Sequence, residues 1–307
     1  MKRFLAFIAA LLLLWPPLWA DEEGYASSTD LSVTLSSIPE AKVALAQNFT
    51  FPFLRGDGML TQGNSISTTV TAELSPISIN GLAELVWTPI AFFQLVAGGR
   101  IGSGWNITLG DEIIGIGKNV RNSDGSTAVD GSAFDGLLWK LNGGAVLQFD
   151  LAALFPGDWH HVVFHSYHEI NYAAYTAADA HESWYFEADF GENRNGFNYY
   201  GNYLLGYQMP LFLDMVGILV EENQNLYHTA GGEYWGDELP RWTFSALLDF
   251  KITDWMSATL ITQLRTMRNF TSATEGNEFY QDRQIAASPE RRLEFYRVAA
   301  TMKFKLR

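Results

Sequence analysis

The sequence contains no cysteine among its 307 residues. This absence excludes disulfide bonds, thiolate metal sites and cysteine nucleophiles. Positive charge is also scarce, since 20 lysines and arginines stand against 34 acidic residues, for a formal net charge of -14. A nucleic-acid-binding protein needs a basic surface, so nucleic acid is excluded as a partner. Beyond the first twenty residues, no apolar run reaches the length of about 20 residues that a membrane-spanning helix requires.

The first twenty residues have the pattern of an export signal. Lys2 and Arg3 precede an apolar run that ends before two prolines, and Ala20 stands just before Asp21. A basic start, a short apolar stretch and a small residue at the junction are typical of a secretory signal peptide. We predict a signal peptide over residues 1–20, cleaved after Ala20, an N-terminal segment over 21–39 and the main domain over 40–307. An uncleaved N-terminal anchor is the alternative.

Strict alternation of apolar and polar residues dominates the rest of the chain. Residues 241–252 place one set at even positions and another at odd positions: Trp242, Phe244, Ala246, Leu248, Phe250 and Ile252 against Arg241, Thr243, Ser245, Leu247, Asp249 and Lys251. The same period recurs near residues 40–51, 142–154, 197–209 and 292–307. A period of two predicts strands with two unlike faces. A soluble antiparallel sheet and a membrane barrel both produce this pattern.

The connections between these strands favour the barrel. Tight turns rich in proline, glycine or aspartate alternate with long polar stretches over 102–141, 173–196, 223–239 and 271–290. Membrane barrels have short turns at one end and long loops at the other. Aromatic residues also recur eight positions apart on the apolar faces, as with Trp242 and Phe250, which suits two aromatic girdles. We therefore predict an all-β, transmembrane, antiparallel up-and-down β-barrel, with a secreted β-sandwich as the alternative.

As a pattern, residues 41–307 resemble bacterial outer-membrane β-barrel proteins, without a family-specific motif. The resemblance implies residence in the bacterial outer membrane, contact with its lipid and assembly by the barrel assembly machinery. Such proteins often end on an aromatic residue. In this chain Phe304 is followed by Lys305, Leu306 and Arg307.

About ten strands are expected if the first begins at Ala41. This count treats residues 65–86 as a single strand across the membrane. At "SPIS" (Ser75 to Ser78), however, the apolar residues change from even to odd positions, and Pro76 has no backbone N–H to donate to a neighbouring strand. A turn at that point, together with a strand at 31–37 or at 184–189, would give twelve strands instead. Either count encloses a narrow interior.

Residues that could carry chemistry do not converge in the sequence. His161 and His165 share a face about 13 Å apart, and His160 and His168 face the other way, so we predict no metal site and no cofactor. Ser166 and His165 are adjacent on a strand and point apart, so they are a poor catalytic pair. Asp158 with His160, and Asp179 with His181, resemble the acid–histidine pairs of the omptins, which are ten-stranded barrel proteases. We predict no catalytic residue, and keep an omptin-like protease or lipid-modifying barrel enzyme as the alternative.

Charged residues on the polar strand faces are the candidates for a lumen lining. They are Lys42, Arg100, Asp150, His161, His165, Glu169, Asp249, Arg265, Arg297 and Lys303. The long loops are acidic, with Asp111, Glu112, Asp124, Asp130, Asp135, Glu233, Asp237 and Glu238, which would concentrate cations at the mouth. The sequence leaves two functions open beside the enzyme. One is a narrow porin-like channel for small solutes, and the other is a structural barrel whose long loops bind a surface ligand.

Overall fold

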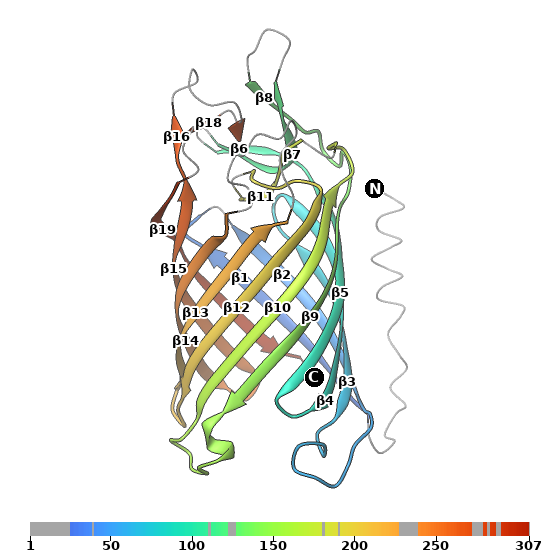
Figure 1. Ribbon diagram of the computed structural model, residues 1–307, viewed down its shortest axis with the longest axis vertical. Coiled ribbons are helices and arrows are strands. Elements are labelled where there is room, and N and C mark those ends of the chain that lie inside the picture. The colour runs from blue at the N-terminus through green and yellow to red at the C-terminus, as the bar shows by residue number, and fades with distance from the viewer. Residues whose placement is uncertain are drawn as a thin grey trace.

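A computed structural model of the chain describes residues 25–38, 40–109, 112–121, 127–179, 182–189, 191–226, 239–271, 279–280, 283–286 and 290–306. Its main body is one closed antiparallel barrel (Figure 1). Twelve strands form the barrel: β1 (Ala26–Ser36), β2 (Ala41–Pro52), β3 (Ser65–Leu74), β4 (Ser78–Ile90), β5 (Phe93–Gly104), β9 (Leu138–Asp150), β10 (Val162–Tyr175), β12 (Gly196–Gln208), β13 (Leu213–Asn225), β14 (Arg241–Thr253), β15 (Met256–Arg268) and β19 (Arg291–Lys305). The all-β barrel is confirmed.

The predicted count of ten strands is wrong, and the alternative of twelve is confirmed. The "SPIS" segment is a turn between β3 and β4, where Ser75 N–H donates to the Ser78 carbonyl at 2.9 Å. The second extra strand is β1, which pairs with β2 on one side and β19 on the other. A barrel that began at Ala41 would leave two strand edges unpaired, and membrane barrels must close. Residues 184–187 do form a strand, β11 (Trp184–Glu187), but it lies outside the barrel.

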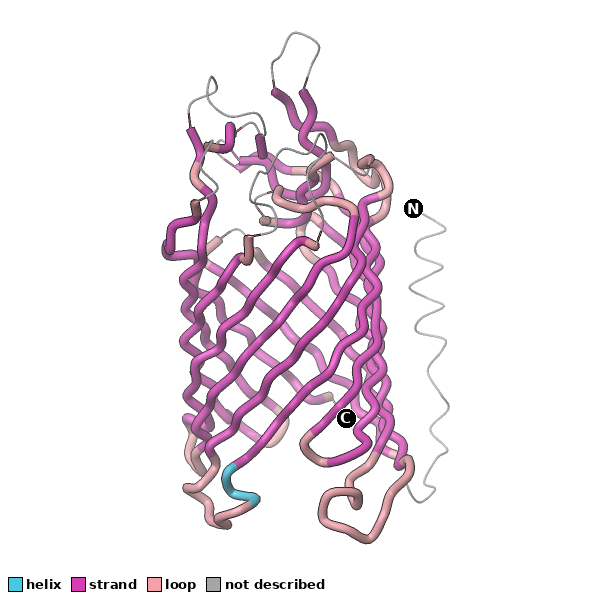
Figure 2. Tube along the Cα trace, viewed as in Figure 1, coloured by secondary structure: helices cyan, strands magenta, loops and turns pink. Residues whose placement is uncertain are grey.

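The longest connections gather at one end of the barrel, and the connection over residues 53–64 lies at the other (Figure 1). Within the longest connections lie β6 (Ile107–Leu109), β7 (Glu112–Arg121), β8 (Thr127–Asp130), β11, β16 (Phe270–Thr271), β17 (Phe279–Tyr280) and β18 (Arg283–Ile285). Figure 2 shows that loops and one short helix, η1 (Leu151–Ala153), join the strands at the other end. Two turns at the long-loop end, 37–40 and 75–77, are short, so the alternation is incomplete on the β1–β4 side.

Large apolar side chains are exposed along the outside of the strands. Examples are Leu147 (47%), Phe164 (44%), Ile170 (48%) and Ile218 (60%). Bare apolar surface on this scale is a liability in water but is the normal outer face of a barrel in lipid. The apolar positions of the alternating sequence therefore form the outer face of the barrel.

The last strand departs from the predicted alternation near its start. The register of β15 and β19 shifts between Gln263 and Leu264, so that Gln263 pairs with Arg297 and Leu264 with Phe295. Tyr296 is the extra residue of this bulge. The guanidinium groups of Arg265 and Arg297 lie 5.0 and 5.1 Å from its ring centroid. The alternation of residues 292–307 is therefore interrupted at Tyr296.

Candidate functional site

The connection between β10 and β12, residues 176–195, folds over the barrel mouth; we call its described part the crossing loop. Its strand β11 pairs with β7, with Trp184 opposite Lys118 and Glu187 opposite Gly115. A small apolar core packs here, made of Ile116, Leu138, Tyr175, Ala178, Trp184 and Phe186. Ile116 is 0% exposed and Trp184 3%. Apolar burial therefore fixes the loop at the mouth, since burying such side chains stabilises by roughly 1.5–3 kcal/mol each.

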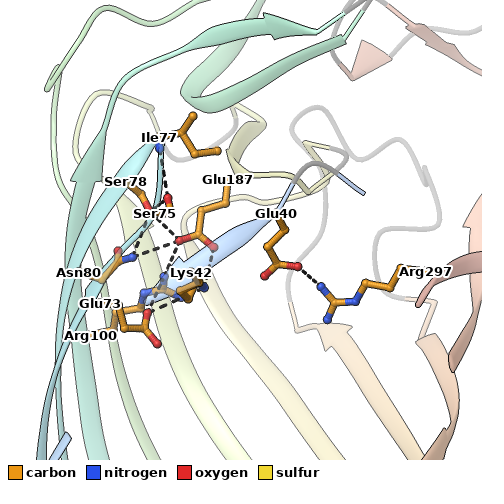
Figure 3. A network of polar contacts seen from close by, with 10 residues as sticks. All are labelled: Glu40, Lys42, Glu73, Ser75, Ile77, Ser78, Asn80, Arg100, Glu187 and Arg297. Carbon is orange, nitrogen blue, oxygen red and sulfur yellow. Dashed lines mark hydrogen bonds and ion pairs between the residues drawn. The ribbon is translucent and has the colours of Figure 1, made fainter. Parts of the chain in front are cut away.

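Glu187 anchors the crossing loop to one wall of the barrel (Figure 3). Its carboxylate accepts hydrogen bonds from Lys42 on β2 at 3.1 Å and from Arg100 on β5 at 3.1 Å. Ser78 and Asn80 on β4 donate to the same group at 2.8 and 3.1 Å. Four side chains from three strands thus converge on one carboxylate of the loop.

The backbone conformation of Glu187 and the pKa of its carboxyl both indicate that its contact with the barrel wall is specific. Its φ is 58°, in the left-handed region that a non-glycine residue adopts at a cost of roughly 1–3 kcal/mol. Burial alone would raise the pKa of Glu187, but the nearby positive charges of Arg100 and Lys42 and the hydrogen bonds outweigh it. The pKa of the carboxyl therefore lies below its usual value, and Glu187 is ionised at neutral pH.

Glu192 anchors the same loop to a second wall. Its carboxylate lies 2.9 Å from Arg291 on β19 and 3.9 Å from Arg268 on β15. The exposed fractions of these three side chains are 8% or less. Burial alone raises the pKa of Glu192, but Arg291, Arg241 and Arg268 together lower it to about 2. The contact is therefore an ion pair at every ordinary pH.

The order of the strands shows that the loop spans the barrel. Around the ring the strands run β1, β19, β15, β14, β13, β12, β10, β9, β5, β4, β3 and β2. The loop leaves from β10 and returns to β12. It reaches β2, β4 and β5 in one direction through Glu187, and β15 and β19 in the other through Glu192. A segment that contacts strands on both sides, far from its own base, must pass across the opening.

A polar cavity of about 280 Å³ lies between the crossing loop and the wall formed by β9, β10 and β12–β14. Amide side chains dominate its lining: Asn171, Asn193, Asn198, Asn223, Gln224 and Asn225. Lys140, Arg194 and Arg241 add positive charge, and Trp184 and Tyr200 add aromatic surface. Glu169 is also present and accepts from Lys140 at 2.6 Å. Amides both donate and accept hydrogen bonds, so this lining suits a small polar solute.

The predicted lumen residues form several separate contacts. Lys42 and Arg100 share Glu187, as described. The others are partnered as follows: Asp150 with His161 at 2.7 Å, Glu169 with Lys140 at 2.6 Å, Asp249 with Thr259 at 2.6 Å, Lys303 with Asp30 at 3.0 Å, Arg297 with Gln263 at 2.6 Å and with Glu40, His165 with Asn202, and Arg265 over Tyr296. Their common exposure to a water-filled lumen stays a prediction. The sequence did not indicate Glu187 or Glu192 as site residues, because both lie in a long connection and their partners are far away in the sequence.

The described histidines have separate partners. His160 contacts the Phe155 carbonyl at 2.9 Å, and His161 contacts Asp150. His168 contacts Ser166 at 2.9 Å, because residues two positions apart share a strand face, whereas the adjacent His165 points away from Ser166. In the described part of the chain, no three histidine, aspartate or glutamate residues gather as metal ligands would. Residue 181 of the omptin-like pair falls outside the described residues.

Across the described residues, no helix is long and apolar enough to cross a membrane. Comparison of the sequence with protein-family models and with curated proteins gives no match.

Three solved structures align with the chain at low similarity. NanC porin has 7% identity and a TM-score of 0.43, over 91% of this chain and 100% of that one. The β domain of the Bordetella autotransporter BrkA has 9% identity and a TM-score of 0.39, over 92% and 98%. KdgM porin, solved with disordered oligogalacturonate, has 11% identity and a TM-score of 0.36, over 92% and 100%. All three scores lie below the level at which a common fold is normally inferred. The barrel described above rests on the pairing of its own strands.

Proposed function

We propose that the chain is a narrow outer-membrane channel for small polar solutes, whose opening is set by the crossing loop. The observation that carries the proposal is the anchoring of one loop to two walls, through Glu187 on Lys42 and Arg100 and through Glu192 on Arg291. A barrel that serves only as a scaffold has no need of a charged segment held across its mouth.

The export signal and the outer face support the membrane location. The first twenty residues have the pattern of a signal peptide, and the exposed apolar side chains of the strands match a surface that contacts lipid. Each strand of the closed barrel is hydrogen-bonded to a neighbour on both sides, as a membrane requires. We accordingly place the chain in the outer membrane of a bacterium, with the ten charged residues named above lining the lumen.

The lining of the mouth cavity suggests the solute class. Six amide side chains, with Lys140 and Arg241, offer many hydrogen bonds and positive charge at the point where the loop narrows the opening. An apolar solute would remove water from these polar groups without replacing its hydrogen bonds. A hydroxylated or anionic solute can form hydrogen bonds with the same groups.

Single-channel conductance in a planar bilayer tests the proposal. We expect small, fluctuating conductance for the refolded wild-type protein, and a larger and steadier conductance for the double variant Glu187→Gln, Glu192→Gln. The matched control is Glu182→Gln, since Glu182 belongs to the same loop but contacts Lys118 on β7 at 3.0 Å rather than the barrel wall. We expect this control to behave as the wild type.

Two results would contradict the channel. The first is the absence of conductance in both the wild type and the double variant, which would favour the structural barrel that binds a surface ligand. The second is an equal increase in the control and the double variant, which would show that the wall contacts do not set the opening.

A further inference from the structure

A hydrogen-bonded polar cluster lies on the outer face of the barrel, away from the lumen. On β10, Phe164 and Ile170 are exposed to the outside, and Ser166 and His168 stand between them on the same face. His168 is itself exposed, whereas the side chain of Ser166 is buried, with 5% exposure. A titratable side chain on a lipid-facing strand is costly and rare, and where it occurs it usually has a function.

The cluster has the connectivity of an activated serine. Ser166 Oγ lies 2.9 Å from His168 Nε2, and His168 Nδ1 lies 2.7 Å from the Tyr199 hydroxyl on β12. Tyr199 in turn lies 3.3 Å from the Tyr203 hydroxyl. With the proton on Nδ1 and donated to Tyr199, Nε2 is free to accept the serine proton, and Tyr199 can donate to Tyr203. A nucleophile, a base and a group that orients the base are thus linked by consecutive hydrogen bonds.

Gly201 makes room for this arrangement. It is the direct cross-strand partner of His168. A Cβ at position 201 would lie 2.9 Å from the Tyr199 hydroxyl oxygen and 3.1 Å from that of Tyr203. These distances are too short for an ordinary contact, so a side chain there would displace the two hydroxyl groups on which the orientation of His168 depends.

An apolar groove of about 710 Å³ lies on the outer face of β3–β5 and β9. Small residues form its floor, namely Gly81, Ala83, Ala97 and Gly99. Leu85, Ile101 and Leu141 border it and are 44%, 50% and 62% exposed. Strand β9 pairs with β10, and the groove residue Leu141 lies opposite Tyr172, four positions along β10 from His168. Because the groove opens on the lipid-facing side, its occupant in a bilayer is the acyl chain of a lipid.

We propose that Ser166 and His168 are catalytic residues of a second, membrane-facing site that hydrolyses the acyl esters of membrane lipids, with Tyr199 as a positioning residue. Ser166 Oγ attacks the ester carbonyl carbon and transfers its proton to His168 Nε2. The carbon–oxygen bond of the ester breaks, and the leaving alkoxide takes that proton as an alcohol. Water then attacks the acyl-serine, gives a proton through His168 to Ser166, and releases the fatty acid. This site is independent of the channel.

The test uses the full mature chain refolded into phosphatidylethanolamine vesicles, with two readouts. One is the release of free fatty acid, and the other is covalent labelling by a fluorophosphonate reagent, located by peptide mass spectrometry. We expect the wild type to release fatty acid and to be labelled at Ser166. Ser166→Ala and His168→Asn should each lower the release by about a hundredfold or more, as removal of a nucleophile or general base does.

Two further variants separate positioning from folding. Tyr199→Phe should slow the release and also change its pH dependence, which a purely structural loss would not do. His165→Asn is the matched control, because His165 lies on the same strand but bonds Asn202 on the other face, and it should retain full activity. Barrel formation in each variant is checked by its gel mobility before and after heating. Labelling at another serine, no labelling at all, or full activity in a folded Ser166→Ala variant would overturn the proposal.

Discussion

Lys42 Nζ lies 3.1 Å from Glu187 Oε2, although the two residues are 145 positions apart in the chain. The contact joins a strand near the start of the barrel to a loop that emerges almost opposite. This contact and that of Glu192 with Arg291 hold the loop across the mouth. The behaviour of the loop is therefore expected to follow the charge states of two carboxylates.

Acid should release the Glu187 contact. The pKa of this carboxyl is lower in the docked loop than its ordinary value of 4.5, so docking is stabilised above that pH. The stabilisation falls as the pH drops through the docked-state pKa. Conductance measured between pH 7 and pH 3 should therefore rise at the acid end. The Glu187→Gln variant should have the higher conductance at both pH 7 and pH 3. If its conductance still rises in acid as in the wild type, another group causes the rise.

Removing the Glu192 carboxylate should lower the stability of the docked loop by more than removing an exposed charge lowers stability elsewhere. Glu192→Gln takes away the anion shared by the buried Arg268 and Arg291, and breaking a buried pair costs about 3–5 kcal/mol. We expect the loop over 188–195 to become sensitive to added protease. The control is Lys251→Gln, whose partner Asp254 is 96% exposed and whose ion pair is worth about 0–1 kcal/mol. Equal sensitivity in both variants would contradict the buried anchor.

Two adjacent leucines on β14 should respond differently to charge. Leu248→Arg places a cation against the lipid, at a cost of about 2–4 kcal/mol in the free energy of unfolding. Leu247→Arg points to the other face, beside Ser245, which lies 2.8 Å from Gln263, and beside Asp249. It should cost much less. Reversible unfolding in lipid vesicles compares the two, and a larger loss at Leu247 would mean that the lumen and lipid faces have been exchanged.

The native mature protein should begin at Asp21. Export with cleavage after Ala20 removes the basic start and the apolar run. Intact-mass measurement of protein purified from outer membranes checks the junction. Retention of Met1 would show that the first twenty residues act as an anchor instead.

Protease applied to intact cells should cut in the connection between β5 and β9, over residues 105–137. This connection lies at the end with the long loops, which membrane barrels expose to the exterior. The loop that follows β9, over 151–161, lies at the opposite end and should be protected. Cleavage there without cleavage at 105–137 would reverse the orientation.

The sequence alone determined that this chain is made of two-faced strands joined as an antiparallel barrel, because a period of two is local and is written in neighbouring residues such as Leu247 and Leu248. It also indicated the polar strand residues, including Lys42, Arg100 and Arg297. It could not fix the count, because one turn at Pro76 and one closing strand before Ala41 have only weak local signals.

Only the tertiary structure decided what meets inside and outside the barrel. Glu187 reaches Lys42 because closure places a loop after β10 opposite β2, and such a contact depends on ring order and register rather than on spacing. Ser166 reaches Tyr199 through His168 because the register of β10 and β12 sets His168 against Gly201. Register is a property of two strands together, so no single stretch of sequence contains it.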